Sequence, residues 1–277
     1  MKNELSIAFI GGGNMAAALA SGLAGKVCAA GNIHVIDINQ DAHAAWQARG
    51  MSVAAAPGEA LARCRVWVFA VKPQNMKDVV ASTRQWLRDD TLVVSVAAGI
   101  RADTLGAWLG TPEAPFSRLV RCMPNTPALV GAGMTGLAAL DGVDQADREL
   151  AARLLSSVGE VVWVAGDDAL DGVTALSGSG PAYVFLFLEA LVAGGLKVGL
   201  TAEQAKQLAL GTLAGATRLA AESPEPLSVL RERVTSKGGT TAAALAAFEA
   251  AGFAGIVEDA MAAAAQRSRE LAEEFGK

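Results

Sequence analysis

Short, almost continuously apolar segments alternate with helical patterns through the first 165 residues, and this alternation limits the possible folds most strongly. Such runs are typical of strands that are buried on both faces of a sheet. A strand, a helix and another strand in succession predict a right-handed crossover and a parallel sheet. The predicted strands are residues 5–10, 33–37, 66–71, 91–97, 118–122, 135–140 and 160–165, and the predicted helices are residues 15–24, 42–49, 57–62, 76–87, 102–109 and 145–157.

The pattern changes after Asp167 and Asp168, because the rest of the chain is almost entirely helical in pattern. Thr201, followed by Glu203 and Gln204, is a predicted helix cap. The predicted helices here are residues 181–197, 201–222, 226–235, 241–251 and 253–275. We therefore predict an α/β fold in which a Rossmann-type doubly wound sheet, residues 1–166, is followed by an all-α domain, residues 167–277.

Composition excludes several classes of protein. Hydrophobic residues make up 52% and charged residues 18% of the 277 residues, which excludes a disordered chain. A net charge of −5 with scattered Lys and Arg argues against a nucleic-acid partner. Three cysteines without C-x-x-C spacing and two histidines predict no metal site and no disulfide framework, so we expect a cytoplasmic protein. The longest weakly charged run, residues 173–188, is too short to span a membrane, and no targeting segment is expected.

A glycine-rich loop follows the first predicted strand and opens the first helix. Gly11, Gly13 and Ala16 fit the pattern G-x-G-x-x-A, with Asn14 and Met15 inside it. The first glycine makes the tight turn, the second lets the backbone approach a pyrophosphate, and the third small residue permits close helix–strand packing. Helix N–H groups then bind the anion. The loop predicts a dinucleotide site.

The end of the second strand bears on which dinucleotide is bound. Asp37 ends this strand, and an acidic residue there normally binds the ribose 2′-hydroxyl of NAD. The next residues, Ile38 and Asn39, provide no arginine or lysine for a 2′-phosphate. From the residues alone, Asp37 therefore favours NADH.

Four further segments contain more Gly, Pro and hydroxyl residues than structure alone requires. Two follow strands, at the edge where ligands bind in such sheets. The other two precede helices and offer N–H groups to an anion. In chain order the four segments are residues 70–74, 121–127, 174–183 and 235–241.

With these motifs in place, the chain resembles the pyrroline-5-carboxylate reductase family from Gly11 to about Glu270. The most specific parts are residues 71–73, 123–127, 177–183 and 236–241. The resemblance implies reduction of the cyclic imine 1-pyrroline-5-carboxylate to L-proline by NADPH or NADH. It also implies that the helical domain is a dimerisation domain. In such a dimer the active site would join one nucleotide domain to helices from both chains. The dimers would often assemble further into a ring, as in a decamer of five dimers.

The resemblance also implies roles for individual residues. Thr174 would place its hydroxyl on the ring nitrogen, as hydrogen-bond partner or proton donor. The carboxylate anchor would use Ser236, Gly238, Gly239, Thr240 and Thr241. The cofactor would contact Gly11, Gly13, Asn14, Met15, Asp37, Ile38, Asn39, Ala70, Val71, Lys72, Pro73 and Asn125, of which Lys72, Pro73 and Asn125 line the nicotinamide–ribose side. Lys72 is alternatively a structural lysine paired with a carboxylate.

One departure and two alternatives stay open. Many family members have Arg with Ser or Asn after the second strand and prefer NADPH, whereas this chain has Ile38 and Asn39. A β-hydroxyacid dehydrogenase would need a catalytic lysine after the linker, but residues 177–196 contain none. A nucleotide-sensing subunit without activity would have no need of the anchor at residues 236–241. His34 and His43 are interpreted as structural or surface residues, because reduction of a protonated imine needs no histidine base.

Overall fold

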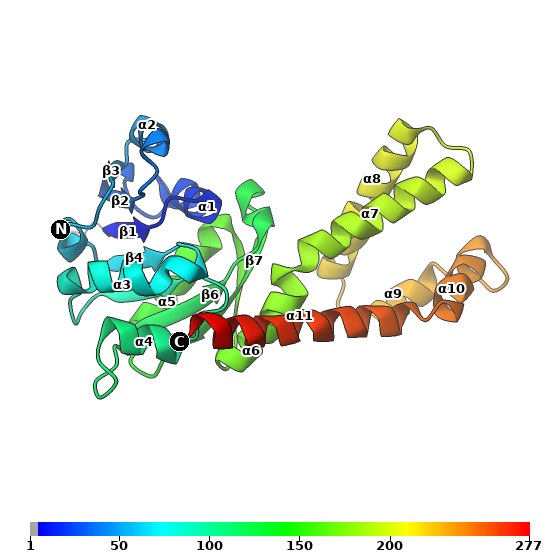
Figure 1. The fold of residues 1–277 in the computed structure, drawn as a ribbon. Helices are drawn as coiled ribbons and strands as arrows, with labels where there is room; N and C mark the ends of the chain where they lie inside the picture. Colours follow the sequence, from blue (N-terminus) through cyan, green and yellow to red (C-terminus); the bar gives the residue numbers. More distant parts are fainter. Residues whose placement is uncertain (1–4) are drawn as a thin grey trace. The chain divides into compact units, whose positions relative to one another are not determined.

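The computed structural model describes residues 5–277 and divides the chain into two compact units (Figure 1). The first unit contains the chain up to Ser179 together with Ala264–Lys277, and the second contains Gly180–Ala263. The sequence boundary predicted between residues 166 and 167 stays a prediction. In the packing of the backbone, the first unit also includes the helical turns up to Ser179 and the last turns of the chain.

The first unit is built on one eight-stranded sheet with the strand order β3-β2-β1-β4-β5-β6-β7-β8. The inner strand β1 pairs in parallel with β2 on one side and with β4 on the other. The chain order therefore reverses at β1, which makes the carboxyl ends of β1 and β4 the topological switch point. The strands are β1 (Ile7–Ile10), β2 (Ile33–Ile36), β3 (Ser52–Ala54), β4 (Val66–Phe69), β5 (Leu92–Ser95), β6 (Leu119–Met123), β7 (Gly133–Ala139) and β8 (Gly159–Trp163).

The doubly wound sheet is confirmed, but the expectation of a wholly parallel sheet is wrong at β7, which runs antiparallel to β6. Only residues 124–132 connect these two strands, which is too short for a crossover helix. The strand β8 returns parallel to β7 because α5 (Gln145–Leu155) lies between them in the chain. The three-residue strand β3 was not expected.

Helices cover both faces of the sheet because alternate residues of each strand point to opposite faces. Along β1, Ile7 and Phe9 pack into one apolar cluster, and Ala8 and Ile10 into another. This arrangement explains why the strands are continuously apolar. Besides α5, the α-helices of the sheet region are α1 (Asn14–Leu23), α2 (His43–Ala48), α3 (Met76–Thr83) and α4 (Ala102–Leu109).

The helix predicted at residues 57–62 is wrong. This stretch contains only the 3-10 turn Leu61–Arg63 and the residues that lead into it. Pro57 and Gly58 begin the segment, and an isolated helix of six residues cannot offset the entropy of its own nucleation. A helix that was not predicted, α6 (Asp167–Val173), instead continues into the π-turn Thr174–Gly178.

The second unit contains helices only. They are α7 (Gly180–Lys197), α8 (Ala202–Glu222), α9 (Leu227–Arg233), α10 (Thr240–Ala250) and the first part of α11 (Phe253–Phe275). The predicted cap at Thr201 is confirmed: its hydroxyl accepts from the Gln204 amide, and the Gln204 side chain accepts from the Thr201 amide. None of the side chains of α7 is buried within the chain.

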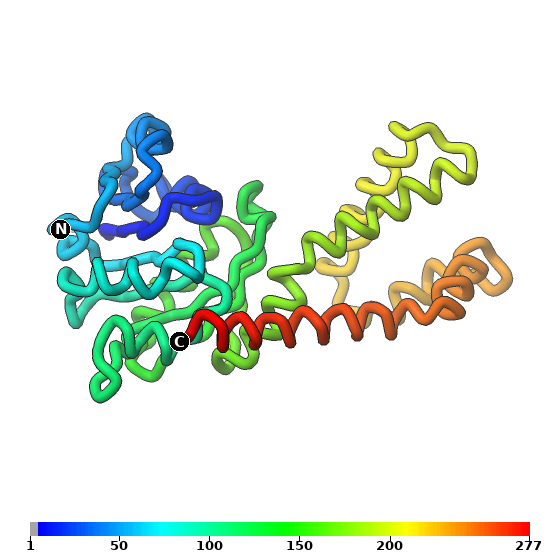
Figure 2. Tube along the Cα trace, in the orientation of Figure 1, coloured from blue at the N-terminus to red at the C-terminus, as the bar shows by residue number. Residues whose placement is uncertain are grey.

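The last turns of α11 belong to the first unit. In Figure 2 they form the red end of the trace, which lies beside α4 and α6. There the Ser268 hydroxyl donates a hydrogen bond to Asp171 of α6, and Leu271 packs against the loop at Gly99. The first unit therefore consists of two segments that are far apart in the sequence.

Candidate active site

The glycine-rich loop connects β1 to α1 at the switch point of the sheet. Gly11 has a φ of +99°, and a Cβ there would lie 2.7 Å from the carbonyl oxygen of Ala70. Only glycine fits, because the backbone conformation and the space both exclude a side chain. Gly13 differs, since a Cβ at this position would meet nothing within 4 Å. Its Cα faces an open cradle, as expected where a pyrophosphate approaches the backbone.

The N-terminus of α1 is free to bind an anion. Its N-cap is Gly13, and no side chain from the described residues caps it. In contrast, α5 is capped by Asp144, and α8 by the Thr201 capping box. The first turn of α1 also contains no acidic residue. Unpaired N–H groups and the helix dipole at this end favour negative charge, so these residues fit a dinucleotide pyrophosphate.

Asp37 lies directly beneath this loop. A Cβ on Gly12 would overlap its carboxylate, and the other carboxylate oxygen, Oδ1, accepts from the Asn39 amide at 2.9 Å. His43 contacts the Asp37 carbonyl oxygen at 2.7 Å through Nε2, which holds the turn after β2 in place. Ile38, in contrast, is 84% exposed. The structure thus brings the predicted ribose carboxylate next to the predicted phosphate loop.

The end of β4 completes this part of the site. Val71 follows Ala70 and also lies against Gly11, because a Cβ on that glycine would come 2.8 Å from the Val71 Cγ1 atom. Lys72 and Pro73 then open a short 3-10 turn. Lys72 is exposed and makes no ion pair with residues 5–277. No carboxylate in this range therefore accounts for it as a structural lysine.

Asn125 and Thr174 lie on two neighbouring turns of the first unit. The Asn125 side chain is buried, accepts from the Met134 amide at 2.9 Å, and donates to the Ser177 carbonyl at 3.0 Å. Asn125 therefore connects the loop after β6 to the π-turn. Within this turn the Thr174 hydroxyl donates to the Leu170 carbonyl at 2.8 Å. Since this bond uses the hydroxyl proton, the oxygen is left as an acceptor.

The loop before α10 is a second uncapped helix start, and it belongs to the second unit. Gly238 has a φ of +74°, and Gly239 is the N-cap, without a side-chain cap. A side chain on Gly239 would overlap the Ser236 hydroxyl. Thr240 and Thr241 begin the helix, and their hydroxyls make no hydrogen bond to other side chains or backbone among residues 5–277. Both hydroxyls and the amides of Thr240 and Thr241 are therefore available to an anion, whereas the Gly239 amide donates to the Ser236 carbonyl oxygen at 3.0 Å.

The remaining polar candidates have structural contacts. His34 Nδ1 bonds the Ser52 hydroxyl at 2.9 Å between β2 and β3. The three cysteines are buried and free, and burial raises the pKa of the Cys64 thiol to about 11. In the part of the chain that the structure describes, no group of three or more His, Cys, Asp or Glu side chains could hold a metal ion.

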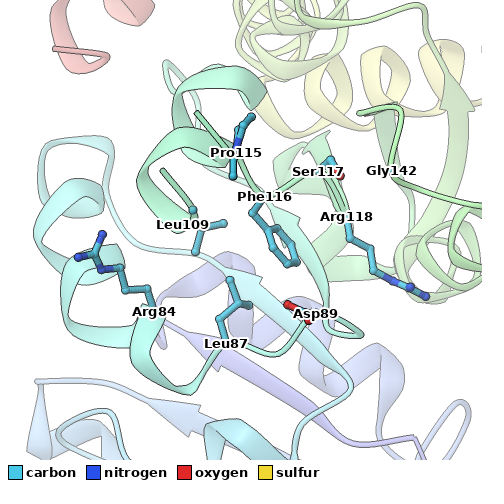
Figure 3. Close-up of a pocket in the computed structure, with 11 residues that line it drawn as sticks. Arg84, Leu87, Asp89, Leu109, Pro115, Phe116, Ser117, Arg118 and Gly142 are labelled. Carbon is cyan, nitrogen blue, oxygen red and sulfur yellow. The ribbon is translucent and has the colours of Figure 1, made fainter. Parts of the chain in front are cut away.

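A separate cleft of about 440 Å³ lies toward the amino ends of β5 and β6 (Figure 3). Leu87, Leu109 and Phe116 lie between Arg84 and Arg118 in this view. The Arg118 guanidinium already pairs with Asp147, at 2.5 Å. Because the cleft lies at the amino ends of the strands, it is at the opposite edge of the sheet from the switch point. None of the predicted site residues lines it.

Sequence reasoning missed a group of charged residues beside the π-turn. Arg121 and Asp167 form an ion pair at 2.5 Å, and Arg101 contacts Asp168 at 3.0 Å and Asp171 at 3.5 Å. The partners in these pairs are separated by 46 to 70 residues. In the sequence, the one local sign of this group is that Asp167, Asp168 and Asp171 lie close together at the predicted domain boundary.

Comparisons with known proteins agree with this geometry. Residues 6–99 match a family model described as NADP oxidoreductase coenzyme F420-dependent, and residues 167–271 match one described as pyrroline-5-carboxylate reductase dimerisation. The pyrroline-5-carboxylate reductase of Pseudomonas aeruginosa is 45% identical over 272 residues, which is 98% of each chain.

Solved structures match the whole chain as well. A pyrroline-5-carboxylate reductase from Coxiella burnetii has a TM-score of 0.90 at 37% identity and covers 97% of this chain and 99% of its own. A Plasmodium falciparum pyrroline carboxylate reductase with NADP bound has a TM-score of 0.86 at 29% identity, covering 98% and 99%. With its Rossmann-type sheet, its uncapped glycine loop and near full-length relatives at this level of identity, the chain belongs to the pyrroline-5-carboxylate reductase family.

Proposed function

We propose that this chain reduces the C=N bond of 1-pyrroline-5-carboxylate to L-proline with a hydride from NAD(P)H. The observation that carries the proposal is the cradle at Gly13, which lies on an uncapped helix N-terminus at the switch point of a family-typical fold. When bound, the reduced nicotinamide supplies the hydride to the imine carbon. The nitrogen is already protonated as the iminium, so the chain itself must position the substrate and stabilise its charges.

The pyrophosphate would be bound by the amides of Gly13, Asn14 and Met15. The loop at Ala70 and Val71 packs against Gly11 and sets the width of this cradle. We assign Lys72, Pro73 and Asn125 to the nicotinamide–ribose side, with Asn125 acting through the loop that it connects to Ser177.

The preferred cofactor would be NADH. The Asp37 carboxylate is held by the Asn39 amide at 2.9 Å, next to the phosphate loop. A carboxylate in this position accepts hydrogen bonds from a ribose 2′-hydroxyl and repels a 2′-phosphate. No arginine or lysine lies between Asp37 and Arg49 in the sequence to offset that repulsion. Ile38 and Asn39 would line the same ribose without adding charge.

The substrate carboxylate would be bound at the N-terminus of α10. Ser236, Thr240 and Thr241 supply hydroxyls there, and Gly238 supplies an amide. Gly239 would leave room for the carboxylate because it has no side chain, while its own amide donates to the Ser236 carbonyl oxygen at 3.0 Å and holds the loop. A helix N-terminus stabilises a carboxylate without any net positive charge nearby. This explains how an acidic chain can bind two anionic ligands.

Thr174 would act on the ring nitrogen as a hydrogen-bond acceptor. Its own proton is used by the Leu170 carbonyl, so its oxygen is suited to accept from the N–H group of the protonated imine. This supports the hydrogen-bonding alternative over proton donation. An acceptor here stabilises the iminium, which is the form that takes up a hydride most readily.

Self-association would cover the apolar helices of the second unit. Phe185 and Leu186 of α7 are 59% and 67% exposed, and Leu208 of α8 is 56% exposed. By length and composition alone, the helical run Asp167–Lys197 could also cross a membrane, as could the bent pair α10 and α11. The family model for pyrroline-5-carboxylate reductase dimerisation matches residues 167–271, which include the first segment and most of the second, and this favours a partner chain as the cover. We further assign a decamer of five dimers, a cytoplasmic location and no nucleic-acid partner.

The test is turnover of purified protein with 1-pyrroline-5-carboxylate and either NADH or NADPH. Loss of absorbance of the reduced cofactor, together with formation of L-proline, is the expected result. Absence of turnover with both cofactors would refute the proposed reaction. Activity with NADPH alone would refute only the assigned preference for NADH.

A further inference from the structure

A partly buried cluster of ion pairs lies next to the candidate site but contains none of its predicted residues. We call Arg101, Arg121, Asp167, Asp171 and Ser268 the α6 cluster. Arg121 of β6 is 3% exposed and Asp171 is 2% exposed. Charged groups this deeply buried need partners, because removing a charge from water is costly.

Every oxygen of the two aspartates in the cluster has a partner. The two Asp167 oxygens bind Arg121 at 2.5 Å and the backbone amide of Ala102 at 2.9 Å, so Asp167 caps α4 from outside. The two Asp171 oxygens bind Ser268 at 2.6 Å and Arg101 at 3.5 Å. The α6 cluster therefore joins β6, the start of α4, α6 and the end of α11.

The α6 cluster is coupled to Thr174 through the helix backbone. Asp171 follows Leu170, whose carbonyl accepts the Thr174 hydroxyl bond. The same helix continues into the π-turn, whose Ser177 carbonyl is bound by Asn125. On the other side, Arg101 ends the loop that leaves the carboxyl end of β5, the edge of the sheet where the dinucleotide binds. A shift of α6 would therefore move Thr174 relative to that edge.

We propose that Asp171 and Ser268 are positioning residues, which fix the α6 turn so that Thr174 and the β5 loop keep the spacing needed for hydride transfer. Ser268 is 97 residues from Asp171 in the sequence and donates its hydroxyl to the Asp171 carboxylate, so a distant segment of the chain helps to position the site. This inference rests on the proposed reaction. A displacement of about 1 Å can lower a rate about a hundredfold, so a modest change in this cluster is expected to affect kcat.

The chain also contains a matched control. Asp147 is 1% exposed and pairs with Arg65 at 2.7 Å and Arg118 at 2.5 Å. It is thus a buried aspartate with two arginine partners, but these arginines directly precede β4 and β6, at the opposite edge of the same sheet. Asp147→Asn should lower thermal stability in the same way as Asp171→Asn, without reaching the candidate site.

The experiment compares Ser268→Ala, Ser268→Thr, Asp171→Asn and Asp147→Asn with the unaltered chain. Thermal melting, kcat, both KM values and the kinetic isotope effect with 4-deuterated cofactor are measured. Ser268→Ala and Asp171→Asn should lower kcat by about tenfold to a hundredfold. The cofactor KM should stay within twofold, and the isotope effect should rise as hydride transfer becomes slower. Ser268→Thr keeps the hydroxyl and should retain most of kcat, and Asp147→Asn should lower only the melting temperature.

Two results would overturn the inference. One is an unchanged kcat in Ser268→Ala, and the other is an equal loss of kcat in Asp147→Asn. Ser268→Ala removes a single hydrogen bond, so it keeps the test valid even if Asp171→Asn fails to fold. Absence of turnover in the unaltered chain would count against the proposed reaction instead, which separates the two failures.

Discussion

Replacing Gly13 with alanine should separate nucleotide binding from folding. Gly13 has φ −72° and ψ −174°, an extended conformation that alanine adopts, and its added Cβ would meet nothing within 4 Å. Alanine is a poorer N-cap than glycine by roughly 0.5–1 kcal/mol. It also restricts the unfolded chain, which stabilises the fold by about 0.4–1 kcal/mol. These terms nearly cancel, so the melting temperature should hardly change.

The same methyl group would occupy the cradle where the pyrophosphate is expected. Loss of one hydrogen bond to a charged phosphate costs about 1.5–3 kcal/mol. This corresponds to a rise in Kd of roughly 10- to 150-fold. Isothermal titration calorimetry with NADH and NADPH measures the change directly, and circular dichroism follows the melting temperature.

Gly11→Ala provides the contrast. With a φ of +99° and the Ala70 carbonyl only 2.7 Å from the added Cβ, this substitution strains the fold itself. The left-handed backbone alone costs about 1–2 kcal/mol, which lowers Tm by roughly 2–4 °C per kcal/mol. A Gly13→Ala chain that binds both nucleotides with unchanged Kd would refute the assignment of the cradle. A Gly11→Ala chain with unchanged Tm would refute the packing argument.

Three other outcomes follow from the site and its surroundings. Asp37→Ser should raise the ratio of kcat/KM with NADPH to kcat/KM with NADH by about tenfold or more, which corresponds to about 1.4 kcal/mol. An unchanged ratio would show that Asp37 does not select the cofactor. Thr174→Val should lower kcat more than it changes KM, while Thr174→Ser keeps most activity; an effect on KM alone would restrict Thr174 to binding. Burial, with Arg63 nearby, lowers the pKa of His34. The unfolded chain therefore takes up a proton more readily, and the free energy of unfolding should fall as the pH drops through about 6.5. Urea unfolding at several pH values should show this slope and a weaker one in His34→Gln.

The geometry of the glycine turn can be predicted from the sequence because it depends on neighbouring residues. The loop at Gly11 follows a continuously apolar strand, and the pairing of β1 with β4 then brings it to Val71. Strand direction was harder to predict, since apolar patterning is the same for parallel and antiparallel strands. The antiparallel β7 is explained by its short connection to β6 and not by its composition.

The contacts that sequence reasoning missed are long-range pairs of charges. Asp167 and Asp168 mark a change of pattern at the predicted boundary, and in the structure they form the first turn of α6, where they pair with Arg121 and Arg101. Nothing in the local sequence indicates that Arg121 lies opposite Asp167 or that Ser268 lies opposite Asp171. Such pairs follow from the topology, which has to be known first.

The discontinuous first unit has a consequence for the order in which this chain can fold during synthesis. Proteins made from the N-terminus generally fold each domain once its residues have left the ribosome. Here Ser268 and Leu271, which pack on Asp171 and on the loop at Gly99, follow all of Gly180–Ala263 in the chain and are made after it. The sheet can form early, but the carboxylate of Asp171 gains its hydroxyl partner only after the entire helical unit has been synthesised. The first unit can therefore be completed only after the second unit has been made.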